Sequence, residues 1–419
     1  MRIAVLSDLH LGYRQYGLMV REQDFYHQFL LCMEAIKKEG VDLLIIAGDL
    51  FDKPNPSPEA MNVYRTGIEK LNGIPVITIK GNHTMLMREN HFSVDNYFDS
   101  ENFTSEYHLL DDSIYQKDNV AIQGMYYRSD SNLEEFVEKQ WKMAKDISGD
   151  EDSFNILVLH QAFEEYCGFS NVDLSIGDIN WYPYDVVICG HIHSHVCEPI
   201  RDGESNIFLQ PGSTERMNIS EARDGQENGK GYWIIDTETH IIDFYSVDFK
   251  RDFLLGDIEF DTLEDIENHF EELEENCSKL KEDPIISYNY YDNSGNSVHI
   301  RELMKDTSKY CLVNNSNVYN MAEEDVVVEI SDGEIPTILD AIKSQDGLSK
   351  EEAKLAADIH EAYKNNLDDS VEGILSTYFI NLKERQKEKG KMDKYHEELE
   401  REIEEYEEFF NNLGRERNV

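Results

Sequence analysis

Five short polar clusters in this sequence contain residue types that bind metal ions. Each cluster carries Asp, Asn or His directly after a short apolar run. The clusters are Asp8-Leu9-His10, Gly48-Asp49-Leu50-Phe51-Asp52, Gly81-Asn82-His83, Leu159-His160-Gln161 and Gly190-His191-Ile192-His193. Imidazole, carboxylate and amide oxygen together suit manganese, iron or zinc, and the lack of a cysteine cluster argues against a structural zinc site. These clusters therefore predict a metal site.

The candidate ligands in these clusters are more numerous than one ion usually takes. They are Asp8, His10, Asp49, Asn82, His160, His191 and His193. Two ions that share a bridging carboxylate would use all of them, and a pair of ions about 3.5–4 Å apart is the common arrangement for in-line displacement at phosphorus. Any one of these residues alone could equally be a turn former or a buried hydrogen-bonding group. Their occurrence in series favours phosphoester chemistry.

The apolar runs before the clusters predict the elements that position them. They are short, rich in Val and Ile, and show little alternation, which is typical of buried strands. Helical patterns separate the first strands, so the chain alternates between strand and helix and predicts a parallel sheet. Ligands of open α/β sheets gather at the carboxyl ends of the strands. We therefore expect the clusters on one rim. The runs are 3–6, 43–47, 76–79, 156–159 and 186–189.

After His193 the pattern changes to strands joined by turns. Residues 207–210, 232–236 and 241–247 predict an antiparallel sheet that completes a sandwich. Beyond them, alternating strand and helix patterns predict a small α+β module. Its elements are a helix over 263–280, a strand over 285–291, a helix over 298–305 and a strand-like segment over 310–313.

We expect an α/β fold, a β-sandwich flanked by helices, followed by a small α+β capping domain and a helical acidic tail. The tail is dense in Glu and Lys. Such a charge run is usually a solvated face, and the alternative is an amphipathic segment that docks on a partner. The predicted domains are 1–252, 253–330 and 331–419.

The composition restricts the function in two ways. The net charge of -46, with a pI near 4.5, opposes nucleic-acid binding, which depends on phosphate neutralisation. Two divalent ions and a local basic rim can outweigh that charge at the site, and the acidic surface is alternatively an adaptation to a salty cytoplasm or to solubility. The six cysteines form no CxxC pair, so we expect reduced thiols in a cytoplasmic protein. Neither a signal peptide nor a membrane span is expected.

Several other residues are candidates for substrate binding. Tyr13, Arg14 and Gln15 combine aromatic, guanidinium and amide groups in the loop after the first strand, which suits a nucleic-acid backbone or a splayed base. A plain surface loop is an equal alternative. Arg88, and Arg216 in the turn over 211–216, are further candidates, with a surface ion pair as the alternative role for Arg216.

The order and spacing of the five clusters resemble the calcineurin-like metallophosphoesterases. Within that superfamily, Ser7-Asp8-Leu9-His10-Leu11-Gly12-Tyr13 and Gly48-Asp49-Leu50-Phe51 are similar to the DNA double-strand-break repair nucleases related to SbcD. The resemblance is strong over the expected first domain and hardly extends to the acidic tail.

The resemblance implies how the ligands and their neighbours act. One manganese ion would take Asp8, His10, Asp49 and His193, and the other Asp49, Asn82, His160 and His191. His83 would protonate the leaving 3′-oxygen or stabilise its charge. The implied activity is a 3′-to-5′ exonuclease and single-strand endonuclease on DNA. Its implied assembly is a homodimer with an SbcC-like ATPase of the structural-maintenance type.

Two positions depart from the pattern of these families. Thr84 replaces the acidic residue that often follows Gly-Asn-His, and Asp52 stands where many of the repair nucleases have histidine. We expect the Asp52 carboxylate to pair with His83, fixing its tautomer and raising its pKa. A smaller-substrate phosphodiesterase or phosphatase remains an alternative, and a catalytically silent scaffold at DNA ends is another.

Overall fold

The computed structural model describes the first of two compact units, residues 1–322. Within it, the described residues exclude 85–92, 100–102, 104, 130–131, 148–152, 168–171, 173, 202 and 204, and the side chains of 224–228. The expected acidic tail and Arg88 therefore lie outside the described residues.

The first sheet carries the three N-terminal clusters. Strands β1 to β4 are parallel neighbours, and β11 and β12 extend the sheet in antiparallel pairs on the other side of β1. Its order is β12 (Ile241–Ser246), β11 (Gly231–Asp236), β1 (Arg2–Leu6), β2 (Leu43–Ile46), β3 (Val76–Thr78) and β4 (Tyr107–Leu109).

The second sheet carries the remaining clusters. Its central strands β6, β7 and β8 are parallel. The expectation that 207–210 joins an antiparallel sheet with 232–236 is wrong, because β10 pairs in parallel with β8, whereas β11 pairs with β1 in the first sheet. The order is β5 (Ser113–Lys117), β6 (Val120–Gly124), β7 (Phe154–His160), β8 (Val186–Gly190), β10 (Ile207–Gln210) and β9 (Val196–Pro199).

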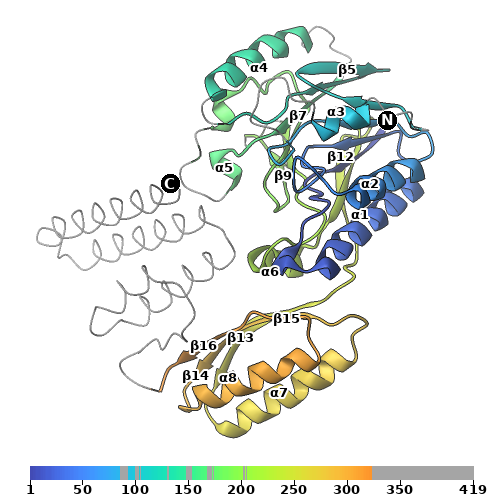
Figure 1. Cartoon of the computed structure of the whole chain (residues 1–419). Coiled ribbons are helices and arrows are strands. Elements are labelled where there is room, and N and C mark those ends of the chain that lie inside the picture. Colours follow the sequence, from blue (N-terminus) through green and yellow to red (C-terminus); the bar gives the residue numbers. More distant parts are fainter. Residues whose placement is uncertain are drawn as a thin grey trace, which may run out of the picture. The chain divides into compact units, whose positions relative to one another are not determined.

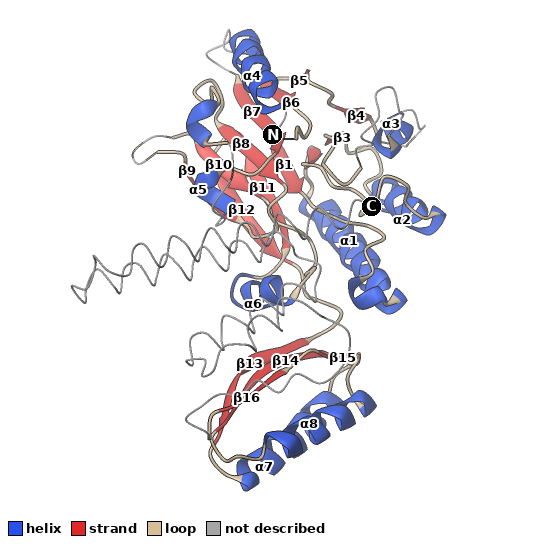
Figure 2. Ribbon diagram, turned by 60° about the vertical axis from the view of Figure 1, so that its left-hand side comes forward, coloured by secondary structure: helices blue, strands red, loops and turns tan. Residues whose placement is uncertain are grey.

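Helices cover the outer faces of these two sheets (Figure 2). Because side chains alternate across a strand, Ile3 and Val5 of β1 pack between the sheets, whereas Ala4 and Leu6 pack against the helices outside. The prediction of an α/β sandwich flanked by helices is therefore confirmed. The described helices of this part are α1 (Met19–Glu39), α2 (Pro58–Lys70), α3 (Val94–Asp99), α4 (Leu133–Ile147), α5 (Glu164–Cys167) and α6 (Ile219–Asn228).

Local sequence sets the ends of the helices next to the first sheet. Helix α1 ends at Gly40, whose φ of 65° suits glycine because other residues pay a steric penalty there. Helix α2 begins at Pro58, and the Ser57 side chain accepts a hydrogen bond from the main-chain nitrogen of Ala60 at 3.1 Å. These turns return the chain to the sheet, so that β2 and β3 end on the rim where β1 ends.

A small module of parallel strands follows, which we call the cap module (residues 253–320). Strands β13 and β14 run parallel, as their connection through a helix requires. The helices α7 and α8 lie on one face of this sheet (Figures 1 and 2). The helices expected over 263–280 and 298–305 and the strand expected over 285–291 are found, while the domain boundaries stay predictions. The strand-like segment expected over 310–313 is wrong in its position, because the strand there covers only Val313–Asn314. Four strands and two α-helices are described in the module. They are β13 (Phe253–Phe260), α7 (Leu263–Ser278), β14 (Ile285–Asp292), α8 (Ser297–Asp306), β15 (Val313–Asn314) and β16 (Asn317–Asn320).

Buried ion pairs hold the segment before the cap module against helix α1. Asp24 accepts from Arg21 Nη1 and from Arg251 Nε, each at 2.7 Å, and all three side chains are at most 2% exposed. Arg251 also donates to the main-chain oxygen of Asp283 in the cap module. The carboxylate of Asp24 thus neutralises two buried guanidinium groups at this junction.

We expect the Asp24→Ala substitution to lower the free energy of unfolding by about 3–5 kcal/mol, because it removes the closest anion of two buried guanidinium groups. The carboxylates that remain, Glu215 for Arg21 and Glu282 for Arg251, are farther away, at 3.5 and 3.7 Å. Chemical denaturation followed by circular dichroism measures the change. Glu282, 37% exposed and 3.7 Å from Arg251, provides the control, and Glu282→Ala should cost no more than about 1 kcal/mol. Equal effects of the two substitutions would show that Asp24 is not the anchor of this junction.

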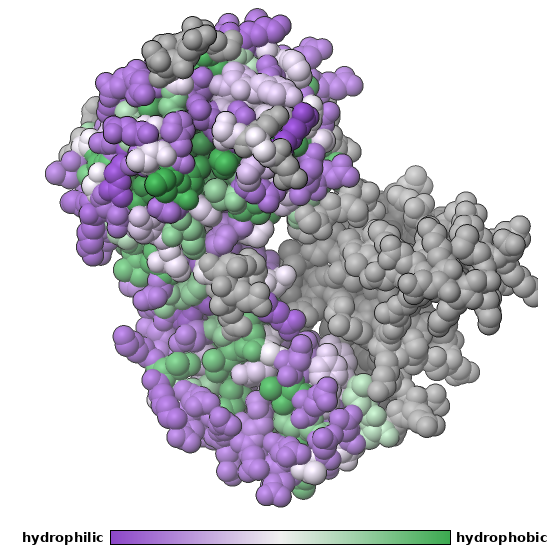
Figure 3. All heavy atoms as spheres, turned by 180° about the vertical axis from the view of Figure 1, so that it is seen from behind, coloured by the Kyte–Doolittle hydropathy of each residue, from purple (hydrophilic) through white to green (hydrophobic). Residues whose placement is uncertain are grey.

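The surface agrees with the polar composition. On the face drawn in Figure 3, hydrophilic side chains cover most of the described surface, and apolar ones form smaller patches. Among the described helices, none is long and apolar enough to cross a bilayer.

Candidate metal centre

The carboxyl ends of strands from both sheets bring the predicted ligands together. Asp8 and His10 follow β1, Asp49 follows β2, and Asn82 follows β3, all from the first sheet. His160 ends β7 in the second sheet. His191 and His193 follow β8, the neighbour of β7. The parallel strands of both sheets therefore place these side chains close together, as the direction of the strands predicts.

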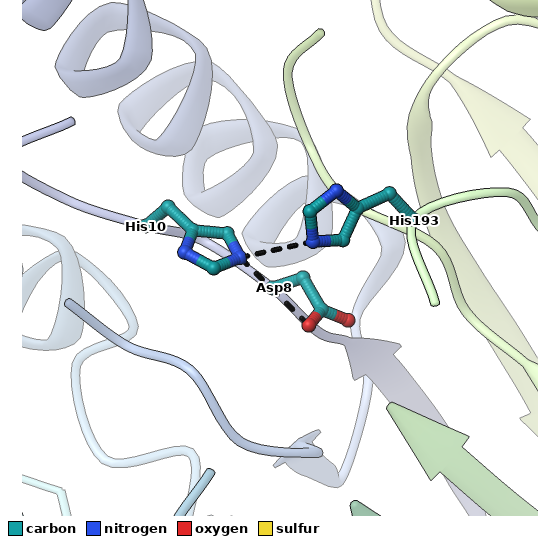
Figure 4. A group of neighbouring side chains, drawn as sticks. All are labelled: Asp8, His10 and His193. Carbon is teal, nitrogen blue, oxygen red and sulfur yellow. Dashed lines mark hydrogen bonds and ion pairs between the residues drawn. The ribbon is translucent and has the colours of Figure 1, made fainter. Parts of the chain in front are cut away.

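One group of side chains consists of Asp8, His10 and His193 (Figure 4). The Nε2 atoms of His10 and His193 lie 3.1 Å apart. The Asp8 carboxylate faces the same point, with Oδ1 3.9 Å from His10 Nε2. His10 and Asp8 are fully buried, so neither side chain is turned to solvent.

A second group consists of Asn82, His160, His191 and Asp49. His160 Nε2 and His191 Nδ1 each lie 3.1 Å from Asn82 Oδ1. His160 Nε2 also lies 3.2 Å from Asp49 Oδ2. A hydrogen bond fixes the orientation of the His160 ring, because the other ring nitrogen, Nδ1, donates to the main-chain oxygen of Ala47 at 2.8 Å.

Asp49 lies between the two groups. The same oxygen that is near His160, Oδ2, is 3.9 Å from His10 Nε2 of the first group. Its other oxygen, Oδ1, accepts from the main-chain nitrogen of His83 at 3.0 Å. The carboxylate is therefore held by the main chain in the position that a bridging ligand between two ions needs.

The donor atoms fit divalent ions. Two donors at right angles on one ion, with bonds of about 2.1 Å, are about 3 Å apart, which matches the His10–His193 and His160–Asn82 separations of 3.1 Å. Nitrogen mixed with carboxylate and amide oxygen suits manganese, iron or zinc. Groups of such ligand atoms within 4.8 Å of one another occur on both sides of Asp49.

The main chain is strained at the ligand positions. Asp8, His10, Asp49 and His191 have φ angles of 51°, 43°, 48° and 93°, although none of them is glycine. Such conformations cost about 1–3 kcal/mol each and persist where the surroundings impose them, often at functional sites. Gly81 permits the close approach of the next strand end, since a Cβ there would overlap Asp49 Oδ1.

Burial and neighbouring charges shift the pKa values of the histidines of the centre in opposite directions. Burial lowers the pKa of His191 to about 3 and that of His10 well below its usual value. Burial acts the same way on His160, but the Asp49 carboxylate outweighs it and raises the pKa of His160 to about 9. Imidazole binds a metal only through an unprotonated nitrogen, so protons and ions compete for His160.

His83 lies beside these ligands. Its ring is perpendicular to that of His10, with centroids 4.7 Å apart. His83 Nδ1 is 2.9 Å from the main-chain oxygen of Asp52, and a carbonyl oxygen only accepts, so Nδ1 carries the proton. That hydrogen bond leaves Nε2 as the nitrogen for proton exchange with a substrate.

The hydrogen bond expected between His83 and the Asp52 carboxylate is wrong, because His83 bonds to the main chain of Asp52 and not to its side chain. The main-chain oxygen of Asp52 makes the hydrogen bond, and the carboxylate lies 3.9 Å from Lys53 Nζ. Burial raises the pKa of the Asp52 carboxyl. The strand-to-loop geometry after β2, which turns this carbonyl toward His83, does not depend on the side chain at position 52.

The proposed substrate-binding residues have different surroundings. Tyr13 donates to the main-chain oxygen of Met217 at 3.4 Å, and the half-exposed Arg14 pairs with Glu22. Gln15 is 3% exposed and donates to the same Met217 oxygen at 2.9 Å. It therefore serves the packing of the loop.

Arg216 also lies in the interior, where it is 3% exposed. Its guanidinium stacks on Phe249 at 3.4 Å from the ring centroid and donates to the main-chain oxygen of Arg251 at 2.7 Å. Its nearest carboxylate is Glu215 at 3.0 Å. These contacts assign Arg216 a structural role near the cap module.

The sequence pattern did not reveal Glu221. It lies in the first turn of α6, and its Oε1 is 2.8 Å from His193 Nδ1. Burial acts to raise its pKa, but His193 and Lys230 outweigh burial and lower it to about 2, so the carboxyl is ionised. The spacing of Asn218 and Glu221 is typical of a helix start, yet it says nothing of a contact with His193.

Comparison with known proteins agrees with this geometry. The family model described as calcineurin-like phosphoesterase matches residues 1–195, which contain all the candidate ligands. The DNA double-strand break repair protein Mre11 of Methanococcus maripaludis is 30% identical over 315 residues, which cover 71% of this chain and 80% of that protein. This chain belongs to the Mre11 family.

Other Mre11 proteins show similar identity. That of Sulfolobus acidocaldarius is 26% identical over 375 residues, covering 86% of this chain and 94% of the relative. That of Methanocaldococcus jannaschii is 30% identical over 257 residues, covering 58% and 64%. The similarity to Mre11 proteins thus extends over more of the chain than the phosphoesterase model matches, and the chain is a metal-dependent phosphoesterase of this family.

Proposed function

We propose that this chain is a two-metal DNA nuclease that processes the ends of double-strand breaks. We further propose that it is a manganese-dependent 3′-to-5′ exonuclease and single-strand endonuclease. The observation that carries the proposal is the position of Asp49 between two groups of nitrogen and oxygen donors. Membership of the Mre11 family supports DNA ends as the substrate.

The residues of the centre have different roles in the proposed reaction. When bound, the two ions supply an acidified water and neutralise charge that grows on the phosphate. Asp8, His10 and His193 would hold the first ion, and Asn82, His160 and His191 the second, with Asp49 shared.

His83 is positioned to give a proton to the leaving 3′-oxygen, because its Nδ1 is fixed on Asp52 and its Nε2 is not. Tyr13 and Arg14, in the loop after β1, are the described residues that we assign to the DNA backbone.

The partners are also part of the proposal. A homodimer that works with an SbcC-like ATPase of the structural-maintenance type follows from the family resemblance, and the cap module gives the chain more surface than a small substrate needs. The net charge of -46 makes DNA binding depend on the ions and on local cations.

Incubation of the purified full chain with Mn²⁺ tests the activity. The substrates are a duplex labelled at its 5′ end, a single-stranded circle, a cyclic nucleotide and p-nitrophenyl phosphate, with Mg²⁺ and Zn²⁺ in parallel. We expect a ladder of shortened duplex strands and linearised circles with Mn²⁺. Hydrolysis of the small esters with DNA left intact would favour a small-substrate phosphodiesterase or phosphatase instead, and inactivity on every substrate would favour a scaffold.

A further inference from the structure

We propose that Glu221 is a positioning residue for the first ion, which fixes the His193 ring with Nε2 facing His10. The inference rests on the two-ion centre proposed above. Glu221 Oε1 is 2.8 Å from His193 Nδ1, and His193 Nε2 is 3.1 Å from His10 Nε2. An ionised carboxylate only accepts hydrogen bonds, so Nδ1 carries the proton and Nε2 keeps its lone pair for a metal.

The carboxylate of Glu221 is itself held in place. Oε1 accepts from Asn218 Nδ2 at 2.9 Å, and Oε2 accepts from the main-chain nitrogen of Met217 at 3.0 Å. Lys230 Nζ is 3.7 Å from Oε2 and donates to the main-chain oxygen of His193 at 2.6 Å. The buried Lys230 ammonium thus holds both the Glu221 carboxylate and the main chain of His193, the ligand that Glu221 orients.

The helix that carries Glu221 packs against the cap module. Ile219 and Ala222 of α6 form a buried cluster with Phe253 and Ile285, the first residues of β13 and β14. These side chains are at most 4% exposed. Because Ile219 and Ala222 fix this turn of α6 in the buried cluster, Glu221 has little freedom to leave His193, so the geometry of the first ion site depends on this packing.

A role as a helix cap alone is the competing explanation. Glu221 Oε2 accepts from the main-chain nitrogen of Met217 at 3.0 Å, which would stabilise the start of α6 without any metal. Asp265 offers a matched control. It lies in the first turn of α7 and accepts from Thr262 N at 2.9 Å, far from any ligand contact in the described residues. Of these two acidic residues, Glu221 alone joins a helix start to a candidate metal ligand.

Titration of metal-free protein with Mn²⁺ separates the two roles. The electron paramagnetic resonance signal of free Mn²⁺ gives the number of bound ions and the two dissociation constants, for the full-length wild type and for Glu221→Ala, Glu221→Gln and Asp265→Ala. Thermal unfolding of each metal-free variant reports on the fold. His193→Ala identifies which of the two constants belongs to the first ion.

For Glu221→Ala we expect one dissociation constant, the one that His193→Ala also changes, to rise about 10- to 100-fold, with the other unchanged. Glu221→Gln should recover part of the loss, because its amide oxygen still accepts from Nδ1. Asp265→Ala should keep both constants. Unchanged constants in Glu221→Ala, or equal weakening of both ions, overturn the inference. A wild type that binds no ion instead refutes the two-ion centre itself.

Discussion

We expect the Asp49→Ala variant to lose both of the proposed metal ions and, with them, DNA cleavage. Asp49 Oδ2 is near His160 of one ligand group and His10 of the other, so a single substitution removes a donor from both ion sites. Loss of one preorganised group that stabilises a transition state typically costs about 10²–10³ in rate. Loss of a ligand shared by both ions should cost at least that much. Metal analysis after gel filtration, together with cleavage of a labelled duplex, measures both effects.

A matched aspartate, just before a strand of the second sheet, provides the control. Asp185 Oδ2 accepts from the main-chain nitrogen of Asn155 at 2.7 Å, just before β8 begins. Asp185→Ala therefore removes a carboxylate that holds main chain, as Asp49→Ala does, but touches no candidate ligand. It should keep two ions and most of the activity. An Asp49→Ala variant that folds and still binds two ions would contradict the bridging role.

The His83→Ala variant should be folded and loaded with both ions, yet cleave DNA about 10²–10⁴-fold more slowly. A positioned acid contributes about that factor when it protonates a poor leaving group, and the 3′-oxygen of DNA is one. The p-nitrophenyl ester of thymidine 5′-phosphate carries a leaving group that needs no proton. Its hydrolysis should fall by less than about tenfold in the variant. Equal losses on both substrates would show that His83 does not act as the acid.

Asp52→Asn distinguishes the main chain from the side chain at this position. The main-chain oxygen of Asp52 accepts from His83 Nδ1 whatever the side chain, so DNA cleavage should stay within about threefold of the wild type. Metal content should not change. A loss as large as that of His83→Ala would return the catalytic role to the carboxylate.

Local sequence was sufficient to predict the strands that position the metal centre. Each ligand directly follows a short Val- and Ile-rich run, and parallel strands bring their carboxyl ends to one rim, so Asp8, Asn82 and His191 were expected together although distant in sequence. The start of helix α2 is likewise set by its own residues, because Ser57 caps it and Pro58 is its first residue. These features depend on residues that are neighbours in the chain.

Features that depend on distant contacts were not readable. The strand pattern of β10 did not reveal that its partner is β8 and not β11, because turn residues indicate where a strand ends and not which sheet it joins. The charge of Arg216 suggested substrate binding or a surface ion pair, yet its guanidinium lies in the interior beside Phe249 and Glu215. Glu221 contacts His193 from α6, a helix that packs on the cap module and whose position no local sequence signal predicts.

An anomalous difference map from a crystal soaked in Mn²⁺, recorded near the manganese absorption edge, tests the central claim most directly. The account predicts two peaks about 3.5–4 Å apart, one on each side of the Asp49 carboxylate. One peak should contact His10 and His193, and the other Asn82 and His160. A single peak, or peaks that do not touch Asp49, would contradict the two-ion centre on which the proposed DNA cleavage rests.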